Sequence, residues 1–396
     1  MARYAILRNL ALGKLTASPF ETLGPRATAA GPPEPSVEVQ GLDLHDIPEV
    51  AKDPQVQAIA PVMPTTLIKP LEAQGAAAPA AGDAWGVAAV KADVSTCTGD
   101  GVIVAVLDTG INKTHPAFNG VEIVEQDFSG SGNGDRNGHG SHCAGTILGR
   151  DVDGKRIGIA RGVKKALIGK VLADNGSGDS DMIFQAIQWA IEQGAQVVSM
   201  SLGFDFPGMV KSLTDAGWPV ELATSNGLEA YRGNLRMFDA LMRMSAAMAA
   251  FRPGSVIVAA AGNESRTNEN PNFKIGASLP AAAEGIVSVG ALQQQPDGKL
   301  GVAYFSNTFP QVAAPGVNIL SVKIGGGLRT LSGTSMACPH VAGVAALWWD
   351  SLRKSGMVAP AAQLVVARLL ASARTDGFAP GVVIADRGAG LVTAPP

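Results

Sequence analysis

From Val102 onward, short runs of almost purely apolar residues alternate with stretches of helical periodicity. The apolar runs lie at residues 102–107, 166–172, 197–200, 256–261 and 286–291. The helical patterns lie at residues 139–148, 180–193, 227–251, 335–352 and 361–372. Uninterrupted apolar runs are typical of strands buried on both faces of a parallel sheet, and strand–helix alternation indicates βαβ units. We therefore expect an α/β fold with a doubly wound, mostly parallel sheet and helices on both of its faces.

The N-terminal part of the chain follows another pattern. Strand-like runs lie at residues 4–7, 37–42 and 56–63. A stretch rich in Pro and Gly at 16–36 predicts a loop, and a short helical pattern lies at 47–52. Residues 71–84, which contain EAQGAAAPAAG, have the composition of a flexible linker. The sequence thus predicts a small α+β unit at residues 1–70, followed by this linker and a larger α/β domain at 85–396.

The composition excludes several classes of protein. Of the 396 residues, 46% are hydrophobic and 16% are charged, which excludes disorder over most of the chain. A formal net charge of −3 argues against a nucleic-acid-binding protein, and no apolar run approaches the roughly 20 residues that span a bilayer. The N-terminus lacks the sustained hydrophobic core of a secretory signal. We therefore expect no nucleic acid and no membrane as partners, and a location in the cytoplasm or export by another route.

Candidate catalytic residues lie in the loops between the predicted strands and helices. The first buried strand ends at Asp108, and two Gly-rich loops lead into helices at His139 and Ser335. Serine becomes a nucleophile when a neutral imidazole accepts its proton, and a carboxylate orients that imidazole. The three residues therefore indicate acyl transfer. A fourth loop contributes the side-chain amide of Asn263, which would form an oxyanion hole with the backbone N–H of Ser335.

The motifs around these residues resemble those of the subtilisin-like serine proteases. They read D-T-G at Asp108, N-G-H-G-S-H-x-A-G-T around His139 and G-T-S-M-A-x-P-H-V-A-G around Ser335, within a similarity that spans roughly residues 85–375. The resemblance implies a serine endopeptidase that hydrolyses peptide bonds through an acyl-enzyme on Ser335 and needs no cofactor. It also implies that Asp108 orients His139, that His139 is the general base and then the general acid, and that Asn263 stabilises the oxyanion.

The resemblance further implies that a peptide or protein substrate binds as an added β-strand. The residues that correspond to the family's substrate-binding backbone are Gly176, Ser177, Gly178, Ser201, Leu202, Gly203 and Gly262. Phe204 stands where glycine is usual in the family, and residues 206–232 look like an insertion before a long helix. Because this insertion borders the expected specificity pockets, the family's substrate preference is not carried over to this chain.

Two further histidines and a possible metal site have to be weighed against this interpretation. We interpret His142 and His340 as structural, because only His139 lies between two glycines where a substrate can reach it. His139 and His142 lack the third and fourth ligands of a metal site. Where calcium-binding members of the family usually place an acid, this sequence has Ala117. We therefore expect no metal ion.

The cysteines are too few for a disulfide framework. Cys143 and Cys338 each lie about one helical turn or less past a predicted catalytic residue, whereas Cys97 precedes the first buried strand. Cys143 is interpreted either as a small buried hydrophobic residue or as a free thiol beneath the histidine, as in proteinase K-like and thermitase-like members. A disulfide between Cys143 and Cys338 remains a third alternative.

The N-terminal unit resembles the family's inhibitory prosegment, most clearly at residues 53–61. This resemblance implies an intramolecular inhibitor and a self-processing precursor, with cleavage expected within residues 68–84. The alternative is an accessory or partner-binding domain. Two other functions remain alternatives to a hydrolytic endopeptidase. One is a peptide-maturation protease or macrocyclase, and the other is a catalytically silent pseudoprotease that binds peptides.

Overall fold

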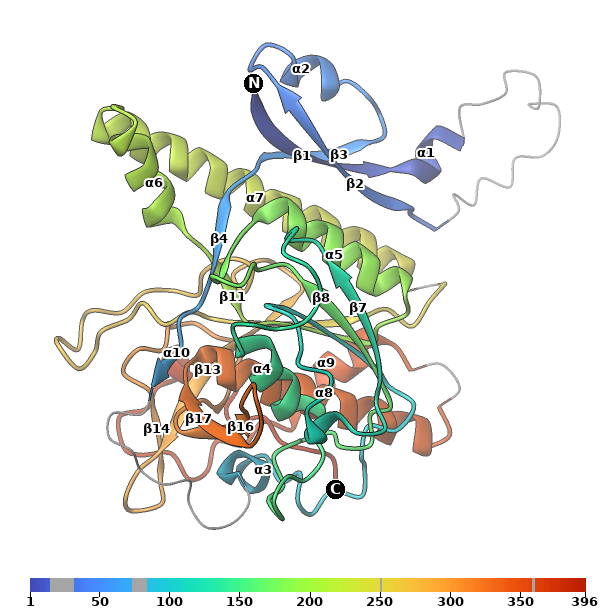
Figure 1. Ribbon diagram of the computed structural model, residues 1–396, viewed down its shortest axis with the longest axis vertical. Helices are drawn as coiled ribbons and strands as arrows, with labels where there is room; N and C mark the ends of the chain where they lie inside the picture. The colour runs from blue at the N-terminus through green and yellow to red at the C-terminus, as the bar shows by residue number, and fades with distance from the viewer. Residues whose placement is uncertain (15–31, 73–83, 250, 358–359) are drawn as a thin grey trace.

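The computed structural model describes residues 1–14, 32–72, 84–249, 251–357 and 360–396. Within these ranges, an eight-stranded sheet forms the centre of the larger domain (Figure 1). Its strand order is β14-β13-β12-β10-β6-β8-β7, β15 also pairs with β13, and only β13 and β14 are antiparallel neighbours. The strands are β6 (Ile103–Asp108), β7 (Glu122–Asp127), β8 (Lys165–Lys170), β10 (Val197–Met200), β12 (Val256–Ala260), β13 (Ile286–Gln294), β14 (Leu300–Val302) and β15 (Val312–Pro315). The expected doubly wound, mostly parallel sheet is confirmed.

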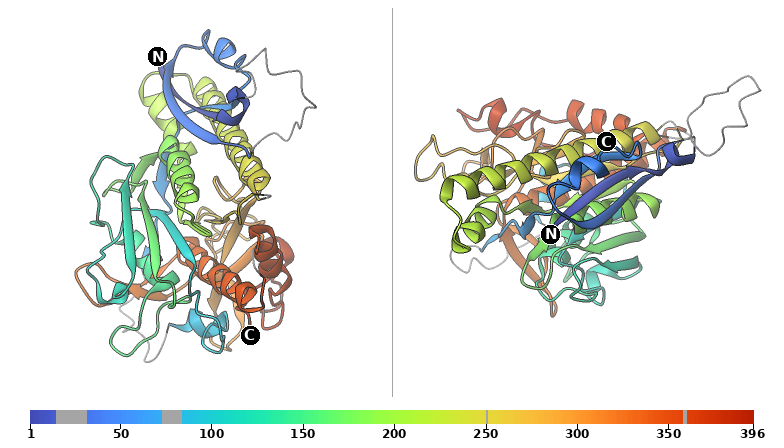
Figure 2. Two further views of the ribbon diagram at one scale, coloured as in Figure 1. Left: turned by 90° about the vertical axis from the view of Figure 1, so that its right-hand side faces the viewer. Right: turned by 90° about the horizontal axis from the view of Figure 1, so that it is seen from above.

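Helices cover both faces of this sheet (Figure 2). Along β6, Val104 and Val106 belong to one buried cluster, whereas Ala105 and Leu107 belong to another. The first cluster also contains residues of α4 (His139–Leu148), α8 (Thr334–Lys354) and α9 (Ala362–Ala371), and the second contains residues of α5 (Ser180–Glu192) and α7 (Val220–Met248). Successive side chains of a strand point to opposite faces, so the two clusters are the cores on either side of the sheet. The shorter helices are α3 (Trp85–Ala89), η1 (Pro116–Phe118) and α10 (Ile384–Arg387).

The predicted insertion differs from the structure in one respect. The insertion contains the helix α6 (Phe206–Asp215) and the start of α7. Helix α7 begins at Val220, whereas the sequence pattern predicted its start at residue 227. The first turns of α7 lie against α6 at the edge of the molecule (Figure 1). Val220 and Leu222 are 63% and 57% exposed there. The sequence pattern missed residues 220–226 because Val220 and Leu222 do not mark a buried face.

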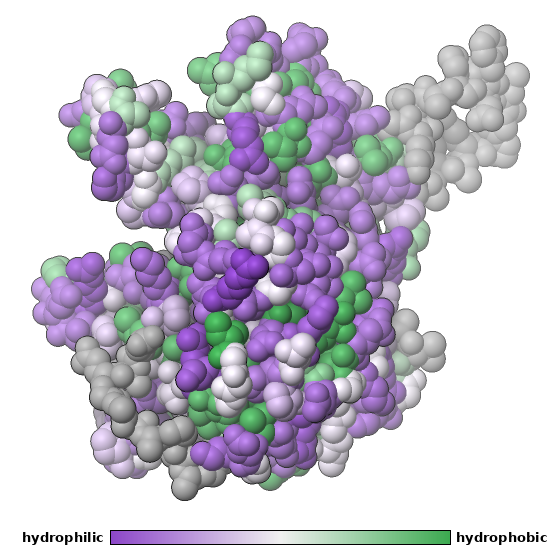
Figure 3. Space-filling model, viewed as in Figure 1, coloured by the Kyte–Doolittle hydropathy of each residue, from purple (hydrophilic) through white to green (hydrophobic). Residues whose placement is uncertain are grey.

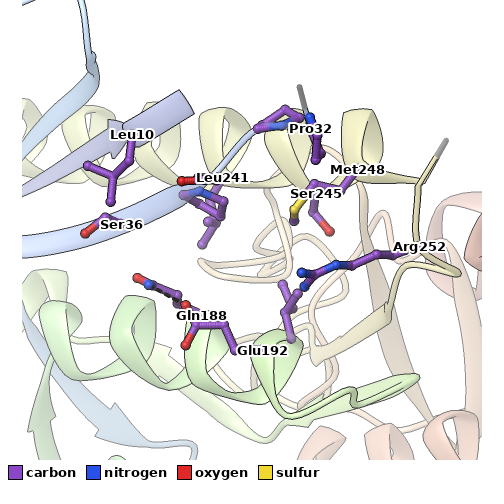
Figure 4. Close-up of a pocket in the computed structure, with 13 residues that line it drawn as sticks. Leu10, Pro32, Ser36, Gln188, Glu192, Leu241, Ser245, Met248 and Arg252 are labelled. Atoms are coloured by element: carbon purple, nitrogen blue, oxygen red, sulfur yellow. Dashed lines mark hydrogen bonds between the residues drawn. The ribbon is translucent and has the colours of Figure 1, made fainter. Parts of the chain in front are cut away.

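The N-terminal unit is a three-stranded antiparallel sheet of order β2-β1-β3 that lies on α5 and α7 (Figures 1 and 2). It contains β1 (Ala2–Asn9), α1 (Leu10–Lys14), β2 (Pro35–Leu42), α2 (Ile47–Val50) and β3 (Val56–Pro61). Most of the predicted loop at 16–36 lies outside the described residues. Arg3 forms ion pairs with Asp179 and Asp181 beside the start of α5. A pocket of about 310 Å³ lies between β2, α5 and α7 (Figure 4).

The chain then passes from this unit across the larger domain. The predicted run 56–63 forms β3 and ends at Pro61. A further strand that the sequence pattern did not predict, β4 (Pro64–Leu67), pairs with β9 (Ser177–Asp179) on one side and β11 (Leu202–Phe204) on the other. Beyond it, β5 (Leu71–Glu72) pairs with β17 (Leu328–Ser332), which itself pairs with β16 (Ile319–Val322). Of the predicted linker 71–84, residues 73–83 lie outside the described part of the chain.

Among the described residues, no helix is both long and apolar enough to cross a bilayer. Hydrophilic residues cover most of the face shown in Figure 3, and the hydrophobic ones are scattered over it.

Two histidines are part of the core. His142 of α4 bonds through Nε2 to the carbonyl oxygen of Ile319 at 3.1 Å, and His340 of α8 bonds through Nδ1 to that of Met336 at 2.8 Å. Burial lowers the pKa of His142 to about 3 and that of His340 to about 4. Both rings are therefore neutral at pH 7, which supports their interpretation as structural residues.

These two histidines predict a pH-dependent stability. Below about pH 6.5 the unfolded chain takes up protons on His142 and His340 that the folded chain does not bind, so protonation favours unfolding. We expect the free energy of unfolding to fall as the pH drops from about 6.5 towards 4, and we expect His142→Gln to reduce this slope. Denaturant unfolding at a series of pH values measures it. The exposed His45→Gln is the control, and an unchanged slope in His142→Gln would contradict the assignment.

Candidate functional site

The predicted catalytic residues meet where the strand order of the sheet reverses. Asp108 is the last residue of β6, His139 is the first residue of α4, and Ser335 is the second residue of α8. The two strands beside β6, β8 and β10, continue the sheet in opposite directions. In open α/β sheets, ligand sites lie at the carboxyl ends of the strands at such a reversal. The fold therefore places all three residues in the expected position for a site.

Asp108 and His139 form a buried pair. Oδ1 of Asp108 and Nδ1 of His139 are 2.8 Å apart, and both side chains are fully buried. The same oxygen accepts the backbone N–H of Thr109 at 2.7 Å. A hydrogen bond from Nδ1–H fixes the tautomer of the ring, which leaves a lone pair on Nε2. Nε2 is buried and makes no hydrogen bond within the described part of the chain.

A neighbouring carboxylate, Asp135, holds the start of α4 in place. Its Oδ1 accepts hydrogen bonds from Thr109 Oγ1 and from the backbone N–H groups of Asn137 and Gly138, at 2.7–3.0 Å. Its Oδ2 accepts the N–H and the hydroxyl of Ser141. Asp135 thus joins the loop after β6 to the first turn of α4. Sequence reasoning assigned it no role, although an acid just before the first turn of a helix is a recognisable capping signal.

The hydroxyl of Ser335 points at a segment of the chain itself. Oγ donates to the carbonyl oxygen of Ile68 at 3.2 Å and lies 3.3 Å from that of Ser201. The hydroxyl of Ser201 in turn donates to the carbonyl oxygen of Ser335 at 3.0 Å. Ile68 directly follows β4 and is 3% exposed. The nucleophile predicted from the sequence therefore lies beside a peptide carbonyl group.

Asn263 contacts the next carbonyl group along that segment. Its Nδ2 donates to the carbonyl oxygen of Lys69 at 3.2 Å, while its Oδ1 accepts the backbone N–H and the hydroxyl of Thr334 at 2.9 Å. Thr334 also accepts the N–H of Gly262 at 3.2 Å. The side-chain amide is therefore fixed against the start of α8, with its N–H group free to bind a carbonyl oxygen.

A second residue without a predicted role, Asn307, supports the loop that carries Asn263. It is fully buried, and its Oδ1 accepts the N–H groups of Glu264 and Ser265 at 3.1 Å. Its Nδ2 donates to the carbonyl oxygen of Ala261 at 3.0 Å. These bonds hold both sides of the loop. No sequence signal marks Asn307, because its partners come from a loop more than forty residues away.

The predicted substrate-binding backbone lies on both sides of β4. Thr66 is opposite Gly203 of β11 and Ser177 of β9, and the N–H of Leu67 donates to the carbonyl oxygen of Gly176 at 2.8 Å. The remaining residues of this predicted set are Gly178, Ser201, Leu202 and Gly262. Residues 64–67 of the chain thus occupy the position that the resemblance assigned to a substrate strand.

All three cysteines are buried and free. Sγ of Cys143 lies 3.8 Å from Nδ1 of His139 and 3.4 Å from the carbonyl oxygen of Ser335. Sγ of Cys338 lies 3.5 Å from Ser199 Oγ. Burial raises the pKa of both thiols, that of Cys338 to about 11. Of the three sequence alternatives for Cys143, the geometry thus favours the thiol beneath the histidine, and no disulfide joins it to Cys338.

Comparison with known proteins identifies the family. The sequence profile of the subtilase family matches residues 99–389. A thermostable alkaline protease of Halalkalibacterium halodurans is 32% identical over 77% of this chain and 70% of its own length. The major intracellular serine protease of Bacillus subtilis is 33% identical over 63% of this chain and 68% of its own length. An intracellular serine protease of Paenibacillus polymyxa is 35% identical over 63% of this chain and 67% of its own length. The chain therefore belongs to the subtilase family and is a subtilisin-like serine endopeptidase.

Proposed function

We propose that Asp108, His139, Ser335 and Asn263 carry out the hydrolysis of peptide bonds, and that residues 1–68 form a prosegment that inhibits the enzyme until it is cleaved off. The observation that carries this proposal is the contact of Ser335 Oγ with the carbonyl group of Ile68 at 3.2 Å, at the end of a strand bound between β9 and β11. A segment held in this way is bound as a substrate is bound.

The reaction follows from the chemistry of these groups. Ser335 Oγ attacks the carbonyl carbon while Nε2 of His139 takes its proton, and Asp108 stabilises the imidazolium that forms. Negative charge develops on the carbonyl oxygen, where Asn263 Nδ2 and the N–H of Ser335 at the start of α8 stabilise it. His139 then gives the proton to the departing amine. Water resolves the acyl-enzyme by the same steps in reverse order.

In the bound segment, the carbonyl oxygen at Asn263 and the carbonyl group beside Ser335 belong to two different residues. Asn263 binds the oxygen of Lys69, whereas the carbonyl group beside Ser335 belongs to Ile68. Hydrolysis of the Ile68–Lys69 bond needs the oxygen of Ile68 at Asn263. The observed arrangement therefore favours inhibition, and cleavage between Ile68 and Lys69 needs a local rearrangement in which the Ile68 oxygen replaces that of Lys69 at Asn263. This position lies within the interval 68–84 expected from the sequence, and any later cut at 73–83 lies outside the described residues.

The catalytic assignments predict kinetic losses of different sizes. In subtilisin itself, loss of the serine or the histidine lowers kcat by about 10⁶, and loss of the oxyanion asparagine lowers it by about 10²–10³. We expect losses of this size for Ser335→Ala, His139→Ala and Asn263→Ala, measured with a fluorogenic peptide. The exposed Asn272→Ala is the control for Asn263. Full activity of Asn263→Ala would refute the oxyanion role, and a wild type unreactive towards a fluorophosphonate would favour a pseudoprotease.

The prosegment assignment predicts that the enzyme cleaves its own chain. We expect the wild type to yield a new N-terminus at Lys69, because the carbonyl group of Ile68 is the one beside the nucleophile. Ser335→Ala is expected to keep its full length, whereas the exposed Ser212→Ala is processed like the wild type. N-terminal sequencing and intact mass measure the outcome. A fully active enzyme with an intact N-terminus would make the N-terminal unit an accessory domain, and a cyclised product would favour a macrocyclase.

The buried thiol predicts sensitivity to mercury. A mercuric ion bound to Sγ of Cys143 needs space next to the imidazole ring, because this sulfur lies 3.8 Å from Nδ1 of His139 in a closely packed interior. We expect inhibition of the wild type, and an active but resistant Cys143→Ala variant, in assays of peptide hydrolysis. Cys97→Ala is the matched control and is expected to stay sensitive. Inhibition that persists in Cys143→Ala would assign the effect to another thiol.

A further inference from the structure

The bound segment contacts the larger domain well before β4 begins. Both backbone polar groups of Met63 bind Ser180, the first residue of α5. The N–H of Met63 donates to Ser180 Oγ at 3.0 Å, and its carbonyl oxygen accepts the N–H of Ser180 at 2.9 Å. These bonds continue the antiparallel register in which Thr65 is opposite Gly178. The cleft therefore pairs with the chain beyond the end of β9.

The side chain of Met63 is buried in a cluster to which the N-terminal unit and the larger domain both contribute. It is fully buried and belongs to the hydrophobic cluster that contains Phe204 of β11 and Phe238 of α7. Counted back from Ile68 as the first residue before the cleaved bond, Met63 is the sixth. The cleft thus offers an apolar environment to the sixth residue as well as bonds to its backbone.

Two residues farther back, α7 provides another contact. Asn234 is fully buried in the middle of this helix, and its Nδ2 donates to the carbonyl oxygen of Pro61 at 2.8 Å and to that of Ala230 at 2.9 Å. Beside it, a Cβ on Gly233 would come within 3.2 Å of Pro61 Cδ. The absence of a side chain at Gly233 allows the segment to approach α7 closely. Pro61 is the eighth residue before the cleaved bond.

The side-chain amide of Asn234 donates hydrogen bonds through Nδ2 but accepts none through Oδ1 among the described residues. Its Oδ1 is buried and has no hydrogen-bond partner among the described residues, which costs free energy. In an extended strand, the N–H and C=O of one residue point to the same side. An amide that donates to a C=O with Nδ2 is therefore placed to accept the N–H of that same residue with Oδ1. The residue here is proline, which has no N–H.

The geometry points to an extended binding site in which Asn234 is a specificity-determining residue for the eighth position of a substrate. The site selects polypeptides that are extended for at least eight residues before the cleaved bond, with an apolar sixth residue and a residue other than proline at the eighth. This inference rests on the proposed function, because it takes the bound segment as a guide to the substrate. Ser180, Gly233 and Asn234 belong to the larger domain and stay in place once the segment has left.

The inference predicts how peptide length and sequence affect cleavage. We would compare kcat/KM of the processed enzyme for fluorogenic peptides that contain TTLI, PVMPTTLI and AVMPTTLI before the cleaved bond. An additional hydrogen bond at the eighth residue is expected to make AVMPTTLI about three- to tenfold better than PVMPTTLI, and both are expected to exceed TTLI. In Asn234→Ala the ratio of AVMPTTLI to PVMPTTLI is expected to fall to about one. Because this is a ratio, a loss of folded enzyme cancels.

Two controls and three outcomes complete the test. The exposed Asn226→Ala on the same helix is expected to keep the wild-type ratio. PAMPTTLI is expected to match PVMPTTLI, because the N–H of residue 62 binds Arg3 within the N-terminal unit rather than α7.

Equal kcat/KM for TTLI and AVMPTTLI would overturn the extended site but leave the endopeptidase intact. A ratio that persists in Asn234→Ala would overturn the role of Asn234. Failure to cleave any of the peptides would overturn the proposed function, and this inference with it.

Discussion

The buried hydrogen bond between Asp108 and His139 is the contact on which the rest of the site depends. Two titratable groups with no exposed surface are stable only when each is hydrogen-bonded. The bond joins the end of β6 to the start of α4, and Asp135 ties the same two segments together a second time. On the opposite side, Thr334 ties Asn263 to the start of α8. The side chains proposed to react are therefore held by rigid elements before any peptide arrives.

In the proposed function, the N-terminal segment uses the contacts that a substrate would use, so that one cleft would serve both inhibition and hydrolysis. The segment between β9 and β11 is bound mainly through its backbone, which every polypeptide has. The folded unit in front of it adds ion pairs of Arg3 with two carboxylates but leaves a pocket beside α5. Ion pairs with partly exposed partners contribute little to stability. We infer an interface that is specific and yet separable.

The fold and the candidate catalytic residues could be predicted from the sequence because both follow local rules. The strands are uninterrupted apolar runs, and Asp108, His139 and Ser335 stand at the element ends that topology brings together. The supporting residues could not be predicted. The partners of Asn307 lie in a distant loop, and β4 forms only because β9 and β11 provide its partners.

Helix α7 is a second example of a feature that could not be predicted from the sequence. Its first apolar side chains, Val220 and Leu222, are exposed, so no apolar periodicity marks where it begins. Asn234 lies in its middle as a polar residue among buried ones, a position that sequence rules treat as unfavourable for a helix. Only the chain that lies against it reveals what the side chain binds. Residues that recognise another segment carry no local pattern of their own.

The covalent connection on both sides of β4 has a consequence for how activity would depend on the amount of protein. While the chain is intact, β4 is tethered through β3 and through β5, so its effective concentration at the cleft is fixed by geometry. Dilution then leaves occupancy unchanged. A cut after Ile68 frees one end, and the N-terminal unit becomes a separate molecule whose occupancy follows mass action. Activation would therefore have two stages, a first-order cut and a release that is more complete the more dilute the enzyme becomes.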